Sequence, residues 1–382
     1  MSALELTFTG AEVLLPGKGL VDAPLSIARG QVTDETYREV NLSGFLVLPG
    51  IVDLHGDGFE PHVAPRRGVM KATEEGLIAT EAEIAANGIT TAVLAQFYSW
   101  EGGLRGPEFA ARVFEALVTM RDEVATDLRG QLRFETHMLD HFEGLKQKLR
   151  DWAVEYIVFN DHLPHDRLSQ GRKPPRLVGQ ALKAGRNPEA HFEMLLDLHA
   201  KGSEVAAALD TLCTELLEDG VLMGSHDDGT AKTRNYWRER GARISEFPET
   251  IEAAEAARSG GDFIVMGAPN LVRGGSHKGN VSALDLVAMG LCDALASDYH
   301  YPSPRRAALM LAQTGVLDFE AAWGLVSSGP AGALGLSDRG TLSPGLRADI
   351  VVLDKENGRV AGTFAGGRAS YLAGDLAARL IG

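Results

Sequence analysis

The chain has little of what marks a secreted, membrane-spanning or nucleic-acid-binding protein. Its 382 residues include two cysteines, Cys213 and Cys292, too few for a disulfide framework. No apolar run approaches the roughly 20 residues that span a bilayer. The first ten residues show no basic region followed by an apolar stretch, so no signal peptide is visible. We therefore expect a cytoplasmic protein with no membrane partner.

Positive charge is scarce as well. The sequence has 37 Lys and Arg residues against 52 Asp and Glu residues, a formal net charge of −15. A nucleic-acid binder needs a clustered positive field that displaces counterions, so we expect no nucleic-acid partner. Residues 163–187 are a local exception, with six basic residues and one acidic residue. This Pro-rich stretch is predicted to be an extended loop, either a solvated surface loop or a lid over a polyanion.

The middle of the chain alternates apolar strand-like runs with amphipathic helical stretches, which is typical of parallel βα units. Seven strand runs are legible, the first being "FLVLPGIVDLH" from Phe45, and an eighth is expected among them. Both ends of the chain instead contain short β-like runs between Gly and Asp turns. The predicted fold class is α/β, a (β/α)8 TIM-like barrel with a small β-sandwich domain built from both chain ends. The predicted boundaries are 1–48 and 340–382 for the sandwich and 49–339 for the barrel, with barrel helices at 108–124, 190–201, 203–218 and 249–258.

Candidate metal ligands recur at the carboxyl ends of predicted strands. The i, i+2 spacing of His55 and Asp57 places both side chains on one face of a strand. Any one such residue alone is readily explained by packing, capping or a salt bridge, but six at equivalent places favour a metal site. A set of imidazoles and carboxylates suits Zn²⁺, Mn²⁺ or Fe²⁺. The six candidates are His55, Asp57, Glu135, His162, His226 and Asp298.

The remaining histidines do not share this placement. His191 and His199 lie on a predicted helix and are expected to have solvated or packing roles. The roles of His137 and His141, which follow Glu135, stay undecided. His62 and His165 lie in basic loops, where we expect them to contact substrate or to be simply exposed.

The motifs "VDLHGDG", "LRFE", "NDHLP", "GSHDDGT", "GAPNLVRGGSHKGN" and "LASDYHYPS" together resemble the amidohydrolase superfamily. Its members carry metal ligands at the ends of strands one, four, five, six and eight of a barrel. Within it, the chain is similar to the diphosphatases of the carbon-phosphorus lyase pathway, which release pyrophosphate from alpha-D-ribose 1-methylphosphonate 5-triphosphate. The resemblance implies a metal-dependent hydrolase of phosphoric anhydrides in phosphonate catabolism, acting on a small anionic sugar phosphate, and a homodimer.

The resemblance also implies roles for the candidate ligands and two divalent ions, with Zn²⁺ expected first and Mn²⁺ or Fe²⁺ as alternatives. His55, Asp57 and Asp298 would hold one ion, His162 and His226 the second, and Glu135 would bridge them. Two such ions activate water at neutral pH. Asp298 is also expected to be the catalytic general base, although a role as ligand alone is equally open.

A triphosphate needs cations around it, and Arg and Lys are the usual phosphate contacts. The predicted substrate-binding residues are Arg66, Arg67, Arg172, Lys173, Arg176, Arg273, His277 and Lys278.

Two departures from the family pattern bear on the substrate. "LPHDRLSQGRKPP" replaces a Pro-Gly-Gln turn after His162, and His300 and Tyr301 are larger than usual at the predicted mouth of the barrel. The alternatives are a deaminase or cyclic amidase acting on C–N bonds, which would have no use for the basic residues, and a catalytically silent scaffold, which would be expected to have lost ligands.

Overall fold

The computed structural model describes residues 3–65, 72–274 and 280–381. The chain divides into two compact units. Unit 1 comprises Met1–Leu94, Thr119–Arg129 and Phe263–Gly382, and unit 2 comprises Ala95–Val118 and Gly130–Asp262. These two units do not correspond to the barrel and the sandwich, so the boundaries predicted for those two domains stay a prediction.

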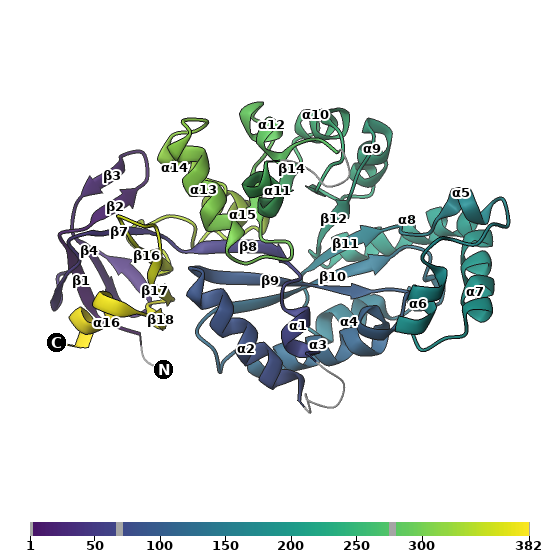
Figure 1. Ribbon diagram of the computed structural model, residues 1–382, viewed down its shortest axis with the longest axis horizontal. Coiled ribbons are helices and arrows are strands. Elements are labelled where there is room, and N and C mark those ends of the chain that lie inside the picture. Colours follow the sequence, from purple (N-terminus) through teal and green to yellow (C-terminus); the bar gives the residue numbers. More distant parts are fainter. Residues whose placement is uncertain (1–2, 66–71, 275–279, 382) are drawn as a thin grey trace. The chain divides into compact units, whose positions relative to one another are not determined.

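The middle of the chain forms the predicted (β/α)8 barrel. Its eight strands follow chain order in one parallel sheet, each flanked by helices (Figure 1). The bridge that closes the sheet pairs Gly56 with Asp298, both in unit 1. The strands are β8 (Ile51–Gly56), β9 (Ile89–Tyr98), β10 (Asp127–Glu135), β11 (Tyr156–Asn160), β12 (Leu222–His226), β13 (Ile244–Glu246), β14 (Phe263–Gly267) and β15 (Ala294–Ala296).

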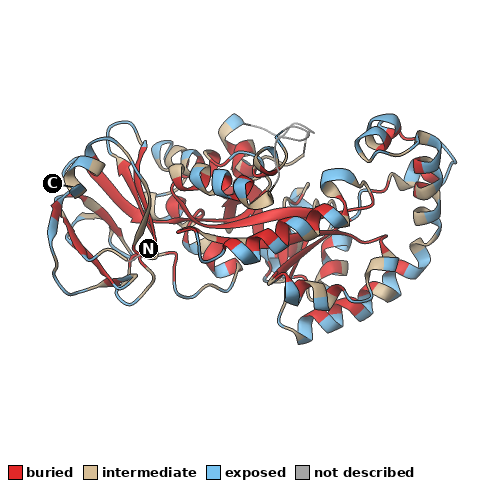
Figure 2. Ribbon diagram, turned by 90° about the horizontal axis from the view of Figure 1, so that it is seen from below, coloured by how far each residue is buried: buried red, intermediate tan, exposed pale blue. Residues whose placement is uncertain are grey.

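β11, β14 and β15 are almost continuously apolar, as expected for parallel strands covered on both faces. β8 and β9 are buried along their whole length (Figure 2). Within unit 2, β10, β11, β12 and β13 pair in parallel, and His226 lies directly opposite Glu246 in the last of these pairings. This register sets which side chains emerge together at the carboxyl ends of the strands.

The two ends of the chain pair with each other in unit 1, as predicted. β7 pairs with β16 from the other end of the chain, antiparallel and in register from Phe45 opposite Asp354 to Pro49 opposite Ile350. One sheet has the order β18-β17-β16-β7-β2-β3 and the other β5-β4-β1-β6, with a shared apolar core. Their strands are β1 (Leu6–Thr9), β2 (Glu12–Leu15), β3 (Gly19–Asp22), β4 (Leu25–Ala28), β5 (Gln31–Thr33), β6 (Glu39–Asn41), β7 (Phe45–Pro49), β16 (Ile350–Asp354), β17 (Val360–Ala365) and β18 (Arg368–Leu372).

Helices occupy most connections between the barrel strands, and the four predicted from periodicity are present. Several begin at a side chain that accepts a hydrogen bond from the first turn, such as Asn187, Thr230 and Thr250. The α-helices are α1 (Glu60–Val63), α2 (Thr73–Ala86), α3 (Pro107–Met120), α4 (Leu145–Asp151), α5 (His165–Leu168), α6 (Leu177–Lys183), α7 (Pro188–Ala200), α8 (Gly202–Glu218), α9 (Ala231–Glu239), α10 (Ile251–Ser259), α11 (Ala268–Arg273), α12 (Ala283–Ala288), α13 (Ser303–Gln313), α14 (Phe319–Gly324), α15 (Ser328–Ala333) and α16 (Gly374–Ile381).

Two local predictions were wrong. "FLVLPGIVDLH" is two strands, because Gly50 separates β7 in the sandwich from β8 in the barrel. A side chain at Gly50 would meet Thr90 at 2.3 Å, so the break needs glycine. Residues 163–187 are not an extended loop, since they include α5 and α6, both of which contact α7.

Across the described ranges, no helix combines the length and the apolar character that crossing a bilayer requires.

Candidate functional site

In unit 1, three of the predicted ligands are held next to one another by main-chain hydrogen bonds. The N–H of Asp57 donates to the carbonyl of Asp298 (2.8 Å), and the N–H of Asp298 donates to the carbonyl of His55 (3.0 Å). His55 is fully buried at the end of β8, and Asp298 is half-buried two residues past β15. The ends of these two strands therefore bring an imidazole and two carboxylate residues to one place.

The buried Asp53 joins the same two strands. Its carboxylate accepts hydrogen bonds from the Ser297 N–H (2.9 Å) and the Ser297 hydroxyl (2.5 Å). Burial raises the pKa of Asp53, and the two bonds from Ser297 oppose that rise. Asp53 was not predicted, but it fixes the register on which the positions of His55 and Asp298 depend.

Asp298 also has an unusual backbone conformation, with φ of 54°. Asp227 (φ 58°) and Phe247 (φ 53°) share it, and each of the three follows a barrel strand within two residues. A residue other than glycine adopts this left-handed region at a cost, and such strain persists where the surrounding structure enforces it. Sharp turns thus redirect the chain after β12, β13 and β15, and ligands were predicted at the first and the last of these strands.

Tyr301, which was predicted at the mouth of the barrel, packs beside the carboxyl end of β8. Tyr301 is buried, and its ring lies 3.1 Å from where a side chain would start at both Gly56 and Gly58. The two glycines of "HGDG" therefore leave room for this ring. His300 is exposed, with Nδ1 2.8 Å from the Ser303 hydroxyl.

In unit 2, Glu135 and His162 form a direct pair. The buried Glu135 carboxylate contacts His162 Nδ1 and accepts hydrogen bonds from the His162 N–H (3.1 Å) and Trp100 Nε1 (3.2 Å). Burial lowers the pKa of His162, but the hydrogen bond and charge of Glu135 outweigh it, so the pKa is raised. The pair joins the loop after β11 to the end of β10.

His226, at the end of β12, lies between an acid and a base of the same unit. Its Nδ1 is 3.2 Å from Asp227 Oδ2, and its Nε2 is 3.1 Å from Arg133 Nη2, which donates to it. The Arg133 guanidinium in turn lies over the Phe97 ring at 3.9 Å. His226 is thus oriented from both sides by neighbours that the sequence analysis did not select.

Glu246 is a candidate ligand that the sequence analysis missed. It is fully buried at the end of β13, opposite His226, and its Oε1 accepts hydrogen bonds from Gln131 Nε2 and the Tyr156 hydroxyl, both at 2.7 Å. Burial and then the charge of Glu246 raise the pKa of Tyr156 well above its ordinary value. The three-residue strand "ISE" is too short for a periodicity, which is why the eighth strand stayed hidden.

Finding β13 changes the strand numbers of the predicted ligands. Glu135 ends the third barrel strand, His162 follows the fourth and His226 ends the fifth. Glu246 therefore occupies the sixth position, where the superfamily resemblance implies a ligand.

The predicted substrate contacts lie in both units. Arg172, Lys173 and Arg176 are exposed in unit 2, and Lys173 is paired with Glu189 at 2.5 Å. In unit 1, the Arg273 guanidinium lies 5.7 Å from the Tyr299 ring, next in sequence to Asp298. Four further predicted contacts fall outside the described residues. They are Arg66, Arg67, His277 and Lys278.

The donor atoms present fit divalent metal ions. Each unit holds imidazole nitrogens and carboxylates that follow barrel strands, and buried neighbours orient them, as second-shell partners orient metal ligands. In unit 2 these residues are Glu135, His162, His226 and Glu246, and in unit 1 they are His55, Asp57 and Asp298.

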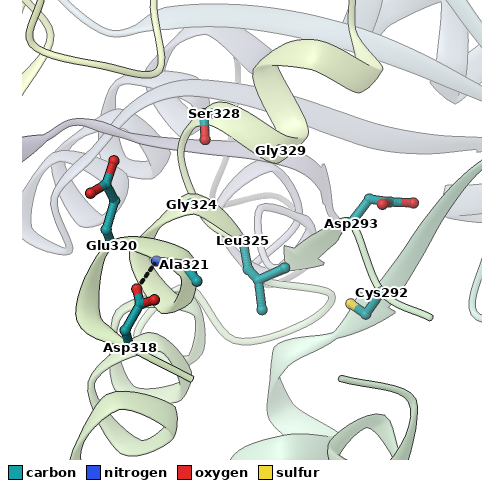
Figure 3. A pocket seen from close by; sticks show the side chains of 9 residues that line it. All are labelled: Cys292, Asp293, Asp318, Glu320, Ala321, Gly324, Leu325, Ser328 and Gly329. Atoms are coloured by element: carbon teal, nitrogen blue, oxygen red, sulfur yellow. Dashed lines mark hydrogen bonds between the residues drawn. The ribbon is translucent and has the colours of Figure 1, made fainter. Parts of the chain in front are cut away.

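A pocket of about 500 Å³ in unit 1 lies elsewhere (Figure 3). Cys292 and Asp293, which precede β15, line it together with residues of α14 and α15. Within α14, the Asp318 carboxylate accepts a hydrogen bond from the Ala321 N–H (2.7 Å). The pocket is at the amino end of β15, whereas active sites of such barrels form at the carboxyl ends, so we do not assign it to the candidate site.

Comparisons with known proteins give the family. Residues 285–363 match the model of the Amidohydrolase family. The chain is 33% identical over 333 residues to the alpha-D-ribose 1-methylphosphonate 5-triphosphate diphosphatase of Escherichia coli (strain K12), covering 83% of this chain and 85% of the relative. It is 32% identical over 225 residues to the adenine deaminase of Sinorhizobium fredii (strain NBRC 101917 / NGR234), covering 54% of this chain and 35% of that one.

A solved amidohydrolase structure has the same fold, with a TM-score of 0.66 at 13% identity over 97% of this chain and 100% of that chain. The chain therefore belongs to the amidohydrolase superfamily, together with the E. coli diphosphatase, and is a hydrolase.

Proposed function

We propose that the protein is a metal-dependent diphosphatase that releases pyrophosphate from alpha-D-ribose 1-methylphosphonate 5-triphosphate in phosphonate catabolism. The observation that carries the proposal is the 33% identity to the E. coli diphosphatase over 85% of that protein. The reaction consumes one water, breaks one P–O–P bond of the triphosphate and leaves the sugar with a 5-phosphate.

The proposed ligands divide into two sets. His55, Asp57 and Asp298 would hold one ion, with Asp298 also accepting the proton of the attacking water. His162, His226 and Glu135 would hold a second ion, and Glu246 joins this set because it lies beside His226. When bound, divalent ions would supply an activated water and stabilise negative charge on the phosphate. Zn²⁺ is expected first, with Mn²⁺ or Fe²⁺ as alternatives.

The basic residues would bind the polyphosphate. Arg172, Arg176 and Arg273 are exposed and offer the planar guanidinium that pairs with phosphate oxygens. The chain carries a net charge of −15, so a triphosphate needs such local cations.

The test uses the purified protein, freed of metal and then supplied with Zn²⁺ or Mn²⁺. Pyrophosphate release is measured with the ribosyl phosphonate triphosphate and with ATP as a matched triphosphate that lacks the phosphonate. We expect metal-dependent release from the first substrate only. Absence of release by protein with bound metal would reject the proposal.

A second candidate function is hydrolysis of a C–N bond, which the 32% identity to an adenine deaminase over 225 residues favours. Ammonia release from adenine under the same conditions tests it. We expect no ammonia release, because adenine is neutral and has no phosphate groups for the exposed arginines to bind.

A further inference from the structure

Unit 2 contains a second cluster of possible metal ligands, separate from the proposed ligand sets. His137 lies in the loop after β10, Asp161 follows β11, His165 begins α5, and His199 is near the end of α7. From the sequence, the role of His137 is undecided, His165 is expected to contact substrate or to be simply exposed, and His199 is expected to have a solvated or packing role. The fold brings together residues that are up to 62 positions apart (199 − 137).

Three of these residues bring possible ligand atoms close to one another. One ligand atom each from His137, Asp161 and His165 all lie within 4.8 Å of one another. Asp161 Oδ1 is 3.1 Å from His165 Nε2 and 3.5 Å from His137 Nδ1. Two donors that share a tetrahedral zinc ion at 2.0–2.1 Å are about 3.3–3.4 Å apart, so the observed spacing suits one ion.

His199 completes the arrangement from outside. Its Nδ1 lies 2.8 Å from His165 Nδ1, on the opposite side of the His165 ring from Asp161. If His165 binds an ion through Nε2, its Nδ1 carries the proton and donates to His199. A ligating histidine usually has such an outer partner, which fixes its tautomer and ring orientation.

From these contacts we propose that His137, Asp161 and His165 bind a transition-metal ion of the Zn²⁺ type, with His199 as the partner that orients His165. Two imidazoles and one carboxylate select Zn²⁺ and its transition-metal neighbours over Mg²⁺ and Ca²⁺, which prefer oxygen ligands. Three protein ligands leave one position for water.

The ion would join three segments of unit 2, the loops after β10 and β11 and helix α5, and through His199 also α7 (Figure 1). Asp161 precedes His162, whose N–H bonds to Glu135. Binding at this cluster would therefore stiffen the backbone that positions His162, without the cluster taking part in the reaction.

The experiment measures Zn²⁺ directly, so its outcome does not depend on the diphosphatase proposal. Wild type, His165→Gln, His199→Gln and the control His141→Gln are equilibrated with Zn²⁺, freed of unbound ion and analysed for zinc per folded chain. His141 belongs to the same connection after β10 but contacts Tyr98 instead of the cluster. We expect His165→Gln to bind about one ion fewer than wild type and His141→Gln, and His199→Gln to bind Zn²⁺ about 10–100-fold more weakly.

Anomalous diffraction from wild-type crystals at the zinc edge provides a measurement that needs no variant. We expect a peak between His137, Asp161 and His165. Equal zinc content in wild type and His165→Gln, or a wild-type map with no peak there, would overturn the proposal and leave the cluster as a hydrogen-bonded chain.

Discussion

At the scale of single residues, Asp298 combines a proposed chemical role with a strained backbone. Its φ of 54° is uncommon for any residue with a side chain, although Asn and Asp tolerate it better than others. Replacement by Asn therefore keeps the turn and the size of the side chain while removing the carboxylate that would accept a proton.

We expect Asp298→Asn to lower kcat for pyrophosphate release by about 10²–10⁴-fold, the usual contribution of a general base. Steady-state kinetics with saturating metal measures the loss, and Asp285→Asn, an exposed acid on α12, is the control. A variant that keeps more than a tenth of the wild-type kcat would show that Asp298 does not accept the proton.

A second prediction at this scale concerns Glu246, whose buried carboxylate is stabilised by hydrogen bonds from two neutral side chains. Tyr156→Phe removes the hydroxyl that donates to Oε1 at 2.7 Å and leaves Gln131 as a donor. A buried hydrogen bond to a charged group contributes about 1.5–3 kcal/mol, so we expect the free energy of unfolding to fall by that amount. Urea denaturation measures it against Tyr299→Phe, whose hydroxyl is on an exposed residue; equal effects of the two variants would contradict the prediction.

At the scale of elements, the connection from β11 to α7 carries the basic residues and decides between the two candidate functions. Arg186, in the same stretch, donates to the carbonyl of Trp100 (2.5 Å), so it serves the fold. Arg172 and Arg176 are exposed and are the ones that we expect to contact substrate.

The double variant Arg172→Gln with Arg176→Gln should raise KM for the triphosphate about tenfold and leave kcat nearly unchanged, because phosphate contacts made equally in the ground state act on binding. Initial rates over a range of substrate concentrations measure both constants. Arg112→Gln on α3 is the control, as Arg112 is exposed and outside the basic stretch. An unchanged KM would show that Arg172 and Arg176 do not bind the triphosphate.

A buried arginine joins α9 to a residue that follows β12 and to a residue that precedes β14. Arg234 on α9 is fully buried and is paired with Asp228 and Asp262, both at 3.2 Å. Burial lowers the pKa of Arg234, and the two carboxylates oppose that change. The pair of acids thus depends on this one buried cation, with Arg238 and Arg243 adding contacts to Asp262.

We expect Arg234→Met to lower the free energy of unfolding by about 3–5 kcal/mol, because it removes the buried cation that is paired with the buried Asp228. Arg243→Met is the matched control: it removes a half-exposed partner of the same Asp262, and exposed pairs contribute about 0–1 kcal/mol. Denaturation of the two variants side by side gives the comparison, and a cost for Arg234→Met no larger than that of the control would contradict this account.

At the scale of the whole molecule, ion pairs join segments far apart in the chain of unit 1. Asp127, at the start of β10, is paired with Arg129 (3.1 Å) and with Arg339 (2.7 Å), which precedes the C-terminal strands. Burial raises the pKa of Asp127, but the two arginines outweigh it, so the pKa is lowered.

A lowered pKa makes the stability dependent on pH in one direction. The contribution of the Asp127 carboxylate to the free energy of unfolding is fully present above the ordinary pKa of 3.8. It is lost as the pH falls through the lowered pKa of this carboxyl in the folded protein. We expect Asp127→Asn to be less stable than wild type at pH 7 by roughly 1.5–3 kcal/mol, as for a hydrogen bond between charged groups, and this difference to shrink below about pH 4. Thermal unfolding from pH 3 to pH 7 measures it, with Asp375→Asn in α16 as an exposed control; a constant difference across that range would refute the linkage.

The sequence by itself determined the fold class, the superfamily and the strand ends at which the proposed ligands lie. Apolar strands alternating with helices specify parallel βα units, and the motifs around His55, His226 and Asp298 are local. Arrangements that depend on distant residues could not be read in this way. Glu246 was missed because its strand has three residues, too few to show a period, and only packing shows that the Tyr301 ring fills the space left by two glycines.

The tertiary structure alone decided which side chains meet. It joined Glu135 to His162, oriented His226 with Arg133, and gathered His137, Asp161, His165 and His199 from separate connections. The physical reason is that hydrophobic periodicity fixes which face of an element is buried, whereas a site needs donor atoms placed within a few tenths of an ångström. That placement comes from strand register, sharp turns and buried hydrogen bonds between residues far apart in the chain.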